Sequence, residues 1–289
     1  MVSNPKRTNA FKIFLAVLIF GSFAVGGIYY KQSLIAKELK KELAKHENIK
    51  YEEVQCFGVQ KAVCHIQKVQ ILEENKVVAK IENVSIEDLY DFAIFAKDKN
   101  GTLPFKLDFS EITFTENSGF DEVGNTKADV NIFGSFSIVG EEKFLNLNEL
   151  KIEDSAIAVI LGIDIKGKDE KDIHLKNFKI AFQKNTDFKN LLSKIQKKEG
   201  VSQQEFENML EKFVSELKPM GNLAEKSGLE IKKFLLNDEV SQINFSAETK
   251  DKKYLNLMKL YMQYFMTLSF DGDANELIEK NLILNVESK

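Results

Sequence analysis

Apolar and polar residues recur in one eight-residue pattern along the chain. The pattern is apolar at its first, third, sixth and eighth positions and polar at the other four. Its strict copies are CHIQKVQI (64–71), AKIENVSI (79–86), LDFSEITF (107–114), LNLNELKI (145–152) and IHLKNFKI (173–180), and LEIKKFLL (229–236) departs from it only at Leu235. With 44% hydrophobic residues, chance predicts about one strict copy. The repetition is therefore a structural signal.

The spacing of the apolar positions excludes an amphipathic helix. At about 100° per residue the four positions fall on two opposite sides of a helix and form no stripe. On a strand, the first two apolar residues face away from the last two, unless one extra residue is accommodated as a bulge. We therefore expect each copy to be a bulged strand or two short strands that meet at a bend.

Polar clusters between the copies predict the turns of a meander. These clusters are Glu73-Glu74-Asn75, Glu153-Asp154-Ser155 and Asn185-Thr186-Asp187. Further strands are predicted at 129–139, 156–165, 242–249 and 281–288. The expected fold class is α+β and β-rich, with an N-terminal transmembrane helix and a curved antiparallel β-meander that carries an inserted helical hairpin and a C-terminal helix.

Two segments with a helical period flank this meander. Residues 31–48 contain Ile35, Leu39 and Leu43 at four-residue spacing, a thin stripe that predicts a charged juxtamembrane helix acting as a stalk. Residues 253–266 are apolar around most of their helical circumference. The second helix is therefore expected to be buried or to meet lipid or a partner.

Residues 187–218 are predicted to form a helical hairpin. Gly200 ends its first arm, Ser202 and Glu205 supply a capping box for the second, and Pro219 follows the second arm. We expect this hairpin to cover one open edge of the sheet and so prevent that edge from pairing with other chains.

The longest apolar stretch of the chain is residues 13–30, which contain no charged residue. Eighteen residues at about 1.5 Å each make a helix of about 27 Å, close to the hydrocarbon thickness of a bilayer. The basic residues Lys6, Arg7 and Lys12 precede it. This order predicts a signal anchor at 13–30 that follows a cytoplasmic tail at 1–12.

A cleaved secretory signal is the alternative interpretation, because Ser22-Phe23-Ala24 is a small-x-small site. Cleavage near Ala24 would release a periplasmic protein, whereas the apolar run that continues to Tyr30 favours the anchor. The excess of lysines after the anchor favours a cytoplasmic domain, but the short basic N-terminus is typical of a signal anchor and large domains translocate regardless of charge. We expect residues 49–289 to form an extracytoplasmic, β-rich domain.

Composition and charge narrow the location and the partners. The 40 basic and 44 acidic residues are interspersed, so no basic stripe indicates nucleic acid as a partner. An abundance of Lys, Asn, Ile, Glu and Phe, with three prolines and no tryptophan, is associated with AT-rich bacterial genomes. This composition favours a single-pass protein of a bacterial inner membrane with its C-terminal domain in the periplasm.

The two cysteines, Cys56 and Cys64, are predicted to form a hairpin disulfide. In an oxidising compartment, the segment from Gly58 to Lys61 can form the bend that brings two short extended arms together. A pair of buried thiols is the alternative. A zinc site is not expected, because only His65 lies nearby and a tetrahedral site needs four ligands.

No sequence motif indicates catalysis, a metal or a cofactor. The histidines are His46, His65 and His174, and we expect them to be solvated rather than catalytic. Asp271 and Asp273 begin a calcium-like spacing, but the glycine and the bidentate glutamate of such a loop are missing.

Asn100 is a candidate modification site. It lies in Asp98-Lys99-Asn100-Gly101-Thr102, which matches an extended acceptor sequence used by some bacterial N-glycosylation systems. An ordinary polar loop is the alternative interpretation.

The order of basic tail, single anchor, stalk and repeated bulged strands resembles bacterial AsmA-like envelope proteins of the repeating-β-groove type. The resemblance covers residues 1–180 and is one of pattern, so it carries over no functional residue. It implies a role in carrying or organising envelope lipids.

Three functional hypotheses follow from these observations. The first is a non-enzymatic, membrane-anchored periplasmic binding or scaffold module, with the membrane reached through 13–30 and a protein or a lipid of the envelope as partner. The second is a lipid-binding or lipid-transfer protein, and the third is an envelope hydrolase. The candidate apolar ligand or partner face consists of Phe109, Phe114, Phe178, Tyr261 and Phe265.

Overall fold

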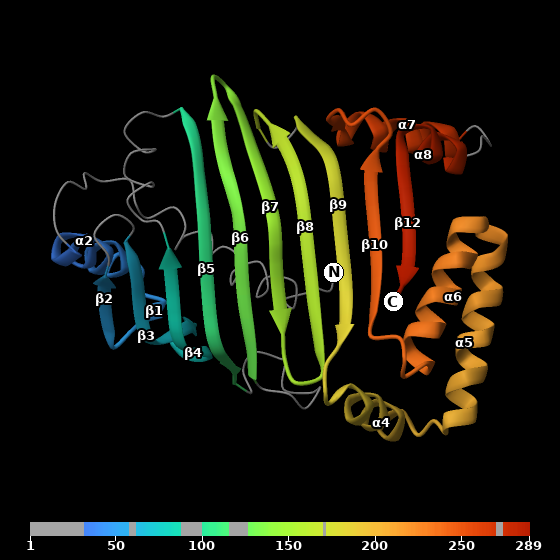
Figure 1. The fold of residues 1–289 in the computed structure, drawn as a ribbon, viewed down its shortest axis with the longest axis horizontal. Coiled ribbons are helices and arrows are strands. Elements are labelled where there is room, and N and C mark those ends of the chain that lie inside the picture. The colour runs from blue at the N-terminus through green and yellow to red at the C-terminus, as the bar shows by residue number, and fades with distance from the viewer. Residues whose placement is uncertain (1–31, 58–61, 88–99, 116–126, 170–171, 270–273) are drawn as a thin grey trace. The chain divides into compact units, whose positions relative to one another are not determined.

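A computed structural model describes residues 32–57, 62–87, 100–115, 127–169, 172–269 and 274–289 (Figure 1). Within these ranges the strands form a twelve-stranded antiparallel sheet, which confirms the β-rich fold class. The chain divides into two compact units, Met1–Ile132 (unit 1) and Phe133–Lys289 (unit 2). The boundary falls within strand β6 (Lys127–Val139), and the units are described separately.

Unit 1 is built on three adjacent antiparallel strands. These are β3 (Val63–Glu73), β4 (Lys76–Glu87) and β5 (Gly101–Phe114), and the short strands β1 (Ile49–Lys50) and β2 (Glu53–Phe57) both pair with β3. Glu74 and Asn75 have φ values of 50° and 65° and make the tight turn between β3 and β4.

The three copies of the eight-residue pattern in unit 1 align in four rows of three apolar residues across β3, β4 and β5. The rows are Cys64, Ile86 and Leu107; Ile66, Val84 and Phe109; Val69, Ile81 and Ile112; and Ile71, Ala79 and Phe114. We call these twelve residues the unit 1 array. All are buried except Phe114, which is partly exposed.

Each strand of this array has one unpaired residue between the second and third rows. Lys68, Glu82 and Glu111 lie at the same level of the three strands, where the ladder is interrupted. Lys68 and Glu111 adopt φ values of 50° and 53°, in the left-handed region. Since the extra residues are level, the register is the same above and below them, and all four rows face one side. The interruption in the middle of each copy, which the pattern predicts, is therefore observed on all three strands.

Helix α2 (Gln32–Leu43) packs within unit 1. Ile35, Leu39 and Leu43 are buried, and the helix lies against β2. The helix was correctly predicted, but the prediction of a stalk is wrong, because its apolar stripe is part of a packed core.

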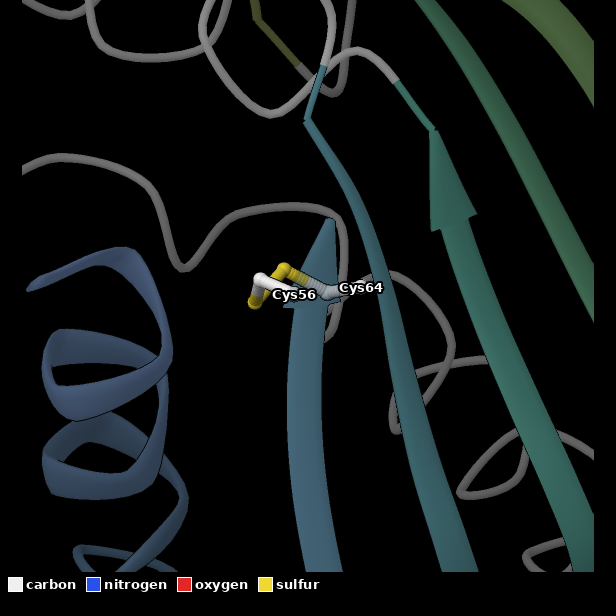
Figure 2. Close-up of a disulfide and its surroundings, with 2 residues drawn as sticks. All are labelled: Cys56 and Cys64. Atoms are coloured by element: carbon white, nitrogen blue, oxygen red, sulfur yellow. A yellow bond between two sulfur atoms is a disulfide. The ribbon is translucent and has the colours of Figure 1, made fainter. Parts of the chain in front are cut away.

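The two cysteines face each other across β2 and β3 (Figure 2). The register pairs Cys56 directly with Cys64, and their Sγ atoms lie 1.91 Å apart, at disulfide distance. Both side chains are buried. The predicted hairpin geometry is therefore the one observed, and the disulfide belongs to the core of unit 1.

Unit 2 continues the antiparallel pattern. Its strands lie in the order β7 (Glu142–Glu153), β8 (Ile157–Gly167), β9 (Ile173–Lys184), β10 (Gln242–Thr249) and β12 (Leu282–Ser288), and β11 (Leu255–Asn256) pairs with β9. The strands expected near 156–165, 242–249 and 281–288 are confirmed, as is the strand at 129–139 in β6.

Bulges on β7 and β9 occupy the middle of the fourth and fifth copies of the pattern. Asn148 and Glu149 together oppose Gly162 on β8, and the register shifts by one residue there. On β9 the extra residue is Lys176, where the register with β8 shifts beside Asp164. As in unit 1, the extra residue keeps both halves of each copy on one face.

The helices between β9 and β10 differ in part from the predicted hairpin. α4 (Phe188–Glu199) ends at Gly200 with a φ of 67°, and α5 (Gln203–Leu217) begins with the predicted capping box of Ser202 and Glu205. A short 3-10 turn, η4 (Lys218–Met220), follows and contains Pro219. The helix that packs along α5 is α6 (Asn222–Leu236), so the hairpin arms are α5 and α6 (Figure 1).

Residues 229–236 belong to α6 and are helical, although they nearly match the strand pattern. Phe234 of α6 is buried with Phe188, Val240, Ile243 and Val286, a cluster that joins α6 to β10 and β12. The expectation that 229–236 forms a strand like the other copies is therefore wrong. The hairpin lies against a sheet face and β12 rather than serving only as a cap on an edge.

Two helices follow β11. α7 (Leu257–Ser269) begins later than the predicted helix at 253–266, because Tyr254 precedes β11 and lies outside the helix. α8 (Ala274–Asn281) packs against α7 and leads into β12.

The predicted anchor at 13–30 and the tail at 1–12 lie outside the described residues, as do Asp271 and Asp273. Among the helices that the structure describes, none combines the length and the apolar composition needed to cross a bilayer. The anchor stays a prediction from the sequence.

Candidate functional site: an open apolar array in unit 2

The bulged strands of unit 2 form a second array of apolar side chains on β7, β8 and β9. Paired residues of antiparallel strands share a face of the sheet. The four rows are Leu145, Ile165 and Leu175; Leu147, Ile163 and Phe178; Leu150, Leu161 and Ile180; and Ile152, Val159 and Phe182. We call these twelve residues the unit 2 array. Like the unit 1 array, it is apolar at every position.

The two arrays differ in exposure. Only Leu147 and Leu175 of the unit 2 array are buried, Ile152 is 44% exposed, and the other members are partly exposed. Phe182 packs against the cluster around Phe234, so part of the last row is covered by α6. The sequence therefore encodes the same apolar surface twice, and the copy in unit 2 is more exposed than the copy in unit 1.

A depression of about 320 Å³ lies at the first row of the unit 2 array. Beyond Leu145 and Ile165, the next residues on the same face are Lys143 and Gly167, which pair with each other. Gly167 lies between Lys143 on β7 and Ile173 on β9, and the backbone of Asp172 approaches it so closely that no side chain would fit there. The apolar lining of the depression is Phe136, Leu145, Ile165 and Ile173, and its charged lining is Lys143, Lys166, Lys168 and Asp169.

Of the three lysines, Lys143 lies on the array face, whereas Lys166 and Lys168 are paired with glutamates. Lys166 Nζ lies 2.9 Å from Glu142 Oε1, and Lys168 Nζ lies 3.2 Å from Glu141 Oε2. The hydrogen bond and the charge of Glu141 raise the pKa of Lys168, so it stays protonated at neutral pH. Lys143 is exposed, and no ion pair is found for it within the described ranges. It is the cation most available to an anionic group.

The opposite face of the same strands carries a polar cluster around Tyr254. Tyr254 Oη donates a hydrogen bond to Asp164 Oδ1 at 2.5 Å, and Lys176 Nζ lies 3.2 Å from Asp164 Oδ2. Lys166 Nζ lies 5.3 Å from the centroid of the Tyr254 ring. Burial, and then the hydrogen bond to Asp164, raise the pKa of the Tyr254 hydroxyl.

A second pair of hydrogen bonds extends the cluster to β11. Asp172 Oδ1 lies 2.7 Å from His174 Nε2, and the Asn256 side chain lies 3.3 Å from the same nitrogen. His174 lowers the pKa of Asp172. The cluster fastens β11 to β9 and so fixes the start of α7. Lys143 and Tyr254 were missed at the sequence level, because only the strand pairing brings them to their neighbours.

The five predicted aromatic residues occupy three different surroundings. Phe109 is buried and Phe114 is partly exposed on β5 of unit 1. Phe178 belongs to the open unit 2 array. Tyr261 and Phe265 are exposed on α7, with ring centroids 4.6 Å apart. Phe109 is therefore a core residue, and Phe178 is the member of the set that lines a candidate ligand surface.

Metal binding and glycosylation are the remaining kinds of site considered from the sequence. Within the described ranges, no group of three His, Cys, Asp or Glu side chains is placed to hold a metal ion. Asn100 is exposed immediately before β5, while Asp98 and Lys99 lie outside the described residues. Glycosylation of Asn100 stays a prediction.

The sequence matches no protein-family model and no curated protein.

Proposed function

We propose that the protein is a non-enzymatic, membrane-anchored binding module of the bacterial envelope, and that the unit 2 array binds the acyl chain of a lipid. The observation that carries this proposal is the contrast between the two arrays. Of twelve apolar side chains in equivalent arrangement, all but Phe114 are buried in unit 1, whereas in unit 2 all but Leu147 and Leu175 are partly or fully exposed. Exposed apolar patches of this extent mark ligand or partner surfaces.

The dimensions of the unit 2 array suit one acyl chain. Four rows, each two residues apart along β8, extend over about 20 Å. One leaflet of a bilayer is about 15 Å of hydrocarbon. An extended acyl chain therefore fits along the strands, and it removes apolar surface of Ile163, Leu161 and Phe178 from water.

The depression supports an anionic head group at one end. Lys143 lies beside the first row and can pair with a carboxylate or phosphate, while the chain runs over Leu145 and Ile165. A fatty acid and a phospholipid share this chemistry. The resemblance to lipid-handling envelope proteins supports the same ligand class.

Two matched variants of β8 test the proposal. Ile163→Glu places a carboxylate in the centre of the unit 2 array, whereas Ile160→Glu introduces the same change on the opposite face of the same strand. The full chain is purified in mild detergent and titrated with cis-parinaric acid, and copurifying lipid is measured by native mass spectrometry. We expect Ile163→Glu to abolish both signals and Ile160→Glu to retain them. Lys143→Gln should raise the dissociation constant of the fatty acid about two- to fivefold.

Other outcomes would overturn the lipid assignment. No copurifying lipid and no parinaric acid binding by the unmodified chain would leave a protein partner as the occupant of the array. If Ile163→Glu and Ile160→Glu lose lipid binding equally while their thermal midpoints are unchanged, the ligand binds outside the unit 2 array.

A further inference from the structure

Helix α7 carries apolar residues on two sides. Leu257, Leu260 and Tyr264 are partly buried and lie on the side toward the fold. On the outer side a second stripe consists of Met258, Tyr261, Met262, Phe265 and Met266, each between 48% and 58% exposed. At about 100° per residue these five positions span an arc of about 140°. We call them the α7 stripe.

The segment that precedes the α7 stripe is basic, whereas α8, which packs against α7, carries Glu276, Glu279 and Lys280. α7 contains no acidic residue, and its only charged residue is Lys259, at the edge of the stripe. Lys250, Lys252 and Lys253 precede the helix, with Asp251 as the only acidic residue among them. All four lysines are exposed, and no ion pair is found for them among the described residues. A partner surface should therefore be apolar with negative charge at its border.

We infer that the α7 stripe docks into the interface of an anionic lipid bilayer. Three observations select this occupant. The stripe has the width and the mixture of Met, Phe and Tyr typical of helices that lie in the plane of a membrane. The four lysines complement anionic head groups, and Lys259 can extend its charged end to them from the edge of the stripe.

The third observation is the apolar segment 13–30, which predicts that the chain is tethered to a bilayer. A tether raises the effective concentration of the membrane surface at α7, so a modest interfacial affinity is sufficient for docking. The fixed start of α7, held by the Tyr254 cluster, presents the stripe as a preformed surface. Docking would bring unit 2 to the source of the ligand proposed above, but it does not depend on that ligand.

A single-cysteine label provides the test. Both native cysteines are joined in a disulfide, so Met262→Cys introduces one reactive thiol for the fluorophore NBD. The matched control is Met209→Cys on α5, where the methionine is equally exposed at 59%. The full chain is placed in phosphatidylglycerol-containing lipid nanodiscs. We expect blue-shifted emission at position 262 that doxyl-labelled lipid quenches, and water-like, unquenched emission at position 209.

Charge variants refine the expected result. Lys252→Gln and Lys253→Gln should each lower the ratio of docked to free α7 about fivefold, since a lysine near an anionic surface contributes on the order of 1 kcal/mol. Replacing the lipid by phosphatidylcholine alone, or raising the salt concentration, should also lower the ratio of docked to free α7. Ile163→Glu should leave the label at 262 unchanged, which separates this test from that of the proposed ligand.

Three results would overturn the inference. Water-like emission at position 262 would show that the stripe does not enter lipid. Blue-shifted emission that doxyl-labelled lipid does not quench would show that the label is buried against protein rather than lipid. If this emission also disappears when the protein is diluted, the occupant is a second copy of the chain. Failure of the chain to elute with the discs would show that α7 does not bind the bilayer.

Discussion

Gly162 faces the bulge residue Asn148 so closely that an added Cβ atom would lie 3.3 Å from the Asn148 backbone oxygen. We predict that Gly162→Val destabilises the fold by about 1–3 kcal/mol, because the β-branched side chain must displace the backbone of the bulge. Urea unfolding of the full chain in detergent measures the change. Ile160→Val introduces the same residue on the same strand with only a methylene removed, and it should cost less. Equal effects would contradict a special role for Gly162.

Glu111 occupies a left-handed conformation that suits glycine better than any other residue. Its φ is 53°, and its ion pair with Lys127 is exposed, so losing that pair costs little. Glu111→Gly should therefore stabilise the fold by up to about 1 kcal/mol, while Glu111→Val should destabilise it. Thermal midpoints of the two variants give the comparison.

Glu82 is the matched control for Glu111. It lies at the same level on the neighbouring strand β4 but is not among the described residues with positive φ. Glycine there only weakens a strand, so Glu82→Gly should lower stability by about 0.5–1 kcal/mol. If glycine raises the stability at both positions, the left-handed backbone conformation of Glu111 is not the cause of the gain there.

Tyr254 gives the fold a defined dependence on alkaline pH. Burial and the contact with Asp164 raise its pKa above the ordinary value of 10.0, so the folded chain holds the phenolic proton more tightly than the unfolded chain. This stabilisation is complete below about pH 10 and is lost as the pH rises toward the folded pKa, by at most about 1.4 kcal/mol per pH unit. Urea unfolding from pH 8 to 11 should show this fall.

Tyr254→Phe isolates that effect from the titration of lysines. At neutral pH the variant should lose about 1.5–3 kcal/mol, because Asp164 is buried and loses a hydrogen-bond donor. The difference between the parent and the variant should then shrink above pH 10. A difference that stays constant to pH 11 would contradict the raised pKa.

The disulfide should contribute measurably to the stability of unit 1. Cys56 and Cys64 are eight positions apart, and closing a loop of this length constrains the unfolded chain by about 2–3 kcal/mol. We expect no free thiol in denatured, unreduced protein, and a corresponding loss of stability in the double variant Cys56→Ala and Cys64→Ala. Two free thiols per chain in protein isolated from cells would disprove the pairing.

The strands and the interruptions within them were predictable from the eight-residue pattern. Its alternating apolar residues indicate a strand, and the two polar residues in its middle indicate where the alternation is interrupted. The apolar residues of the copies 64–71 and 145–152 have no other regular arrangement that places them on one face. By contrast, 229–236 resembles that pattern and is helical. The strong helix formers that precede it, from Ala224 to Lys226, and the packing of Gly228 against α5 decide its conformation.

The candidate site was predictable only in part, because exposure is a tertiary property. Phe178 was identified from its apolar position, as was Phe109, but the sequence does not state that one array is covered and the other open. The partner of α5 was missed for the same reason. The end of α4 at Gly200 and the start of α5 at Ser202 are local signals in the sequence. The choice of α6 as the neighbour of α5 depends instead on packing across the unit.

The level, unpaired residues Lys68, Glu82 and Glu111 constrain how this sequence can change over evolutionary time. A deletion of one of these residues alone would turn half of its strand inside out relative to both neighbours, because a shift of one residue moves every side chain to the other face. Substitutions that preserve polarity leave the pairing intact. We therefore expect natural variants of unit 1 to gain or lose length in the turns between strands, or by whole strand repeats, while the distance between the paired apolar halves of each strand stays fixed.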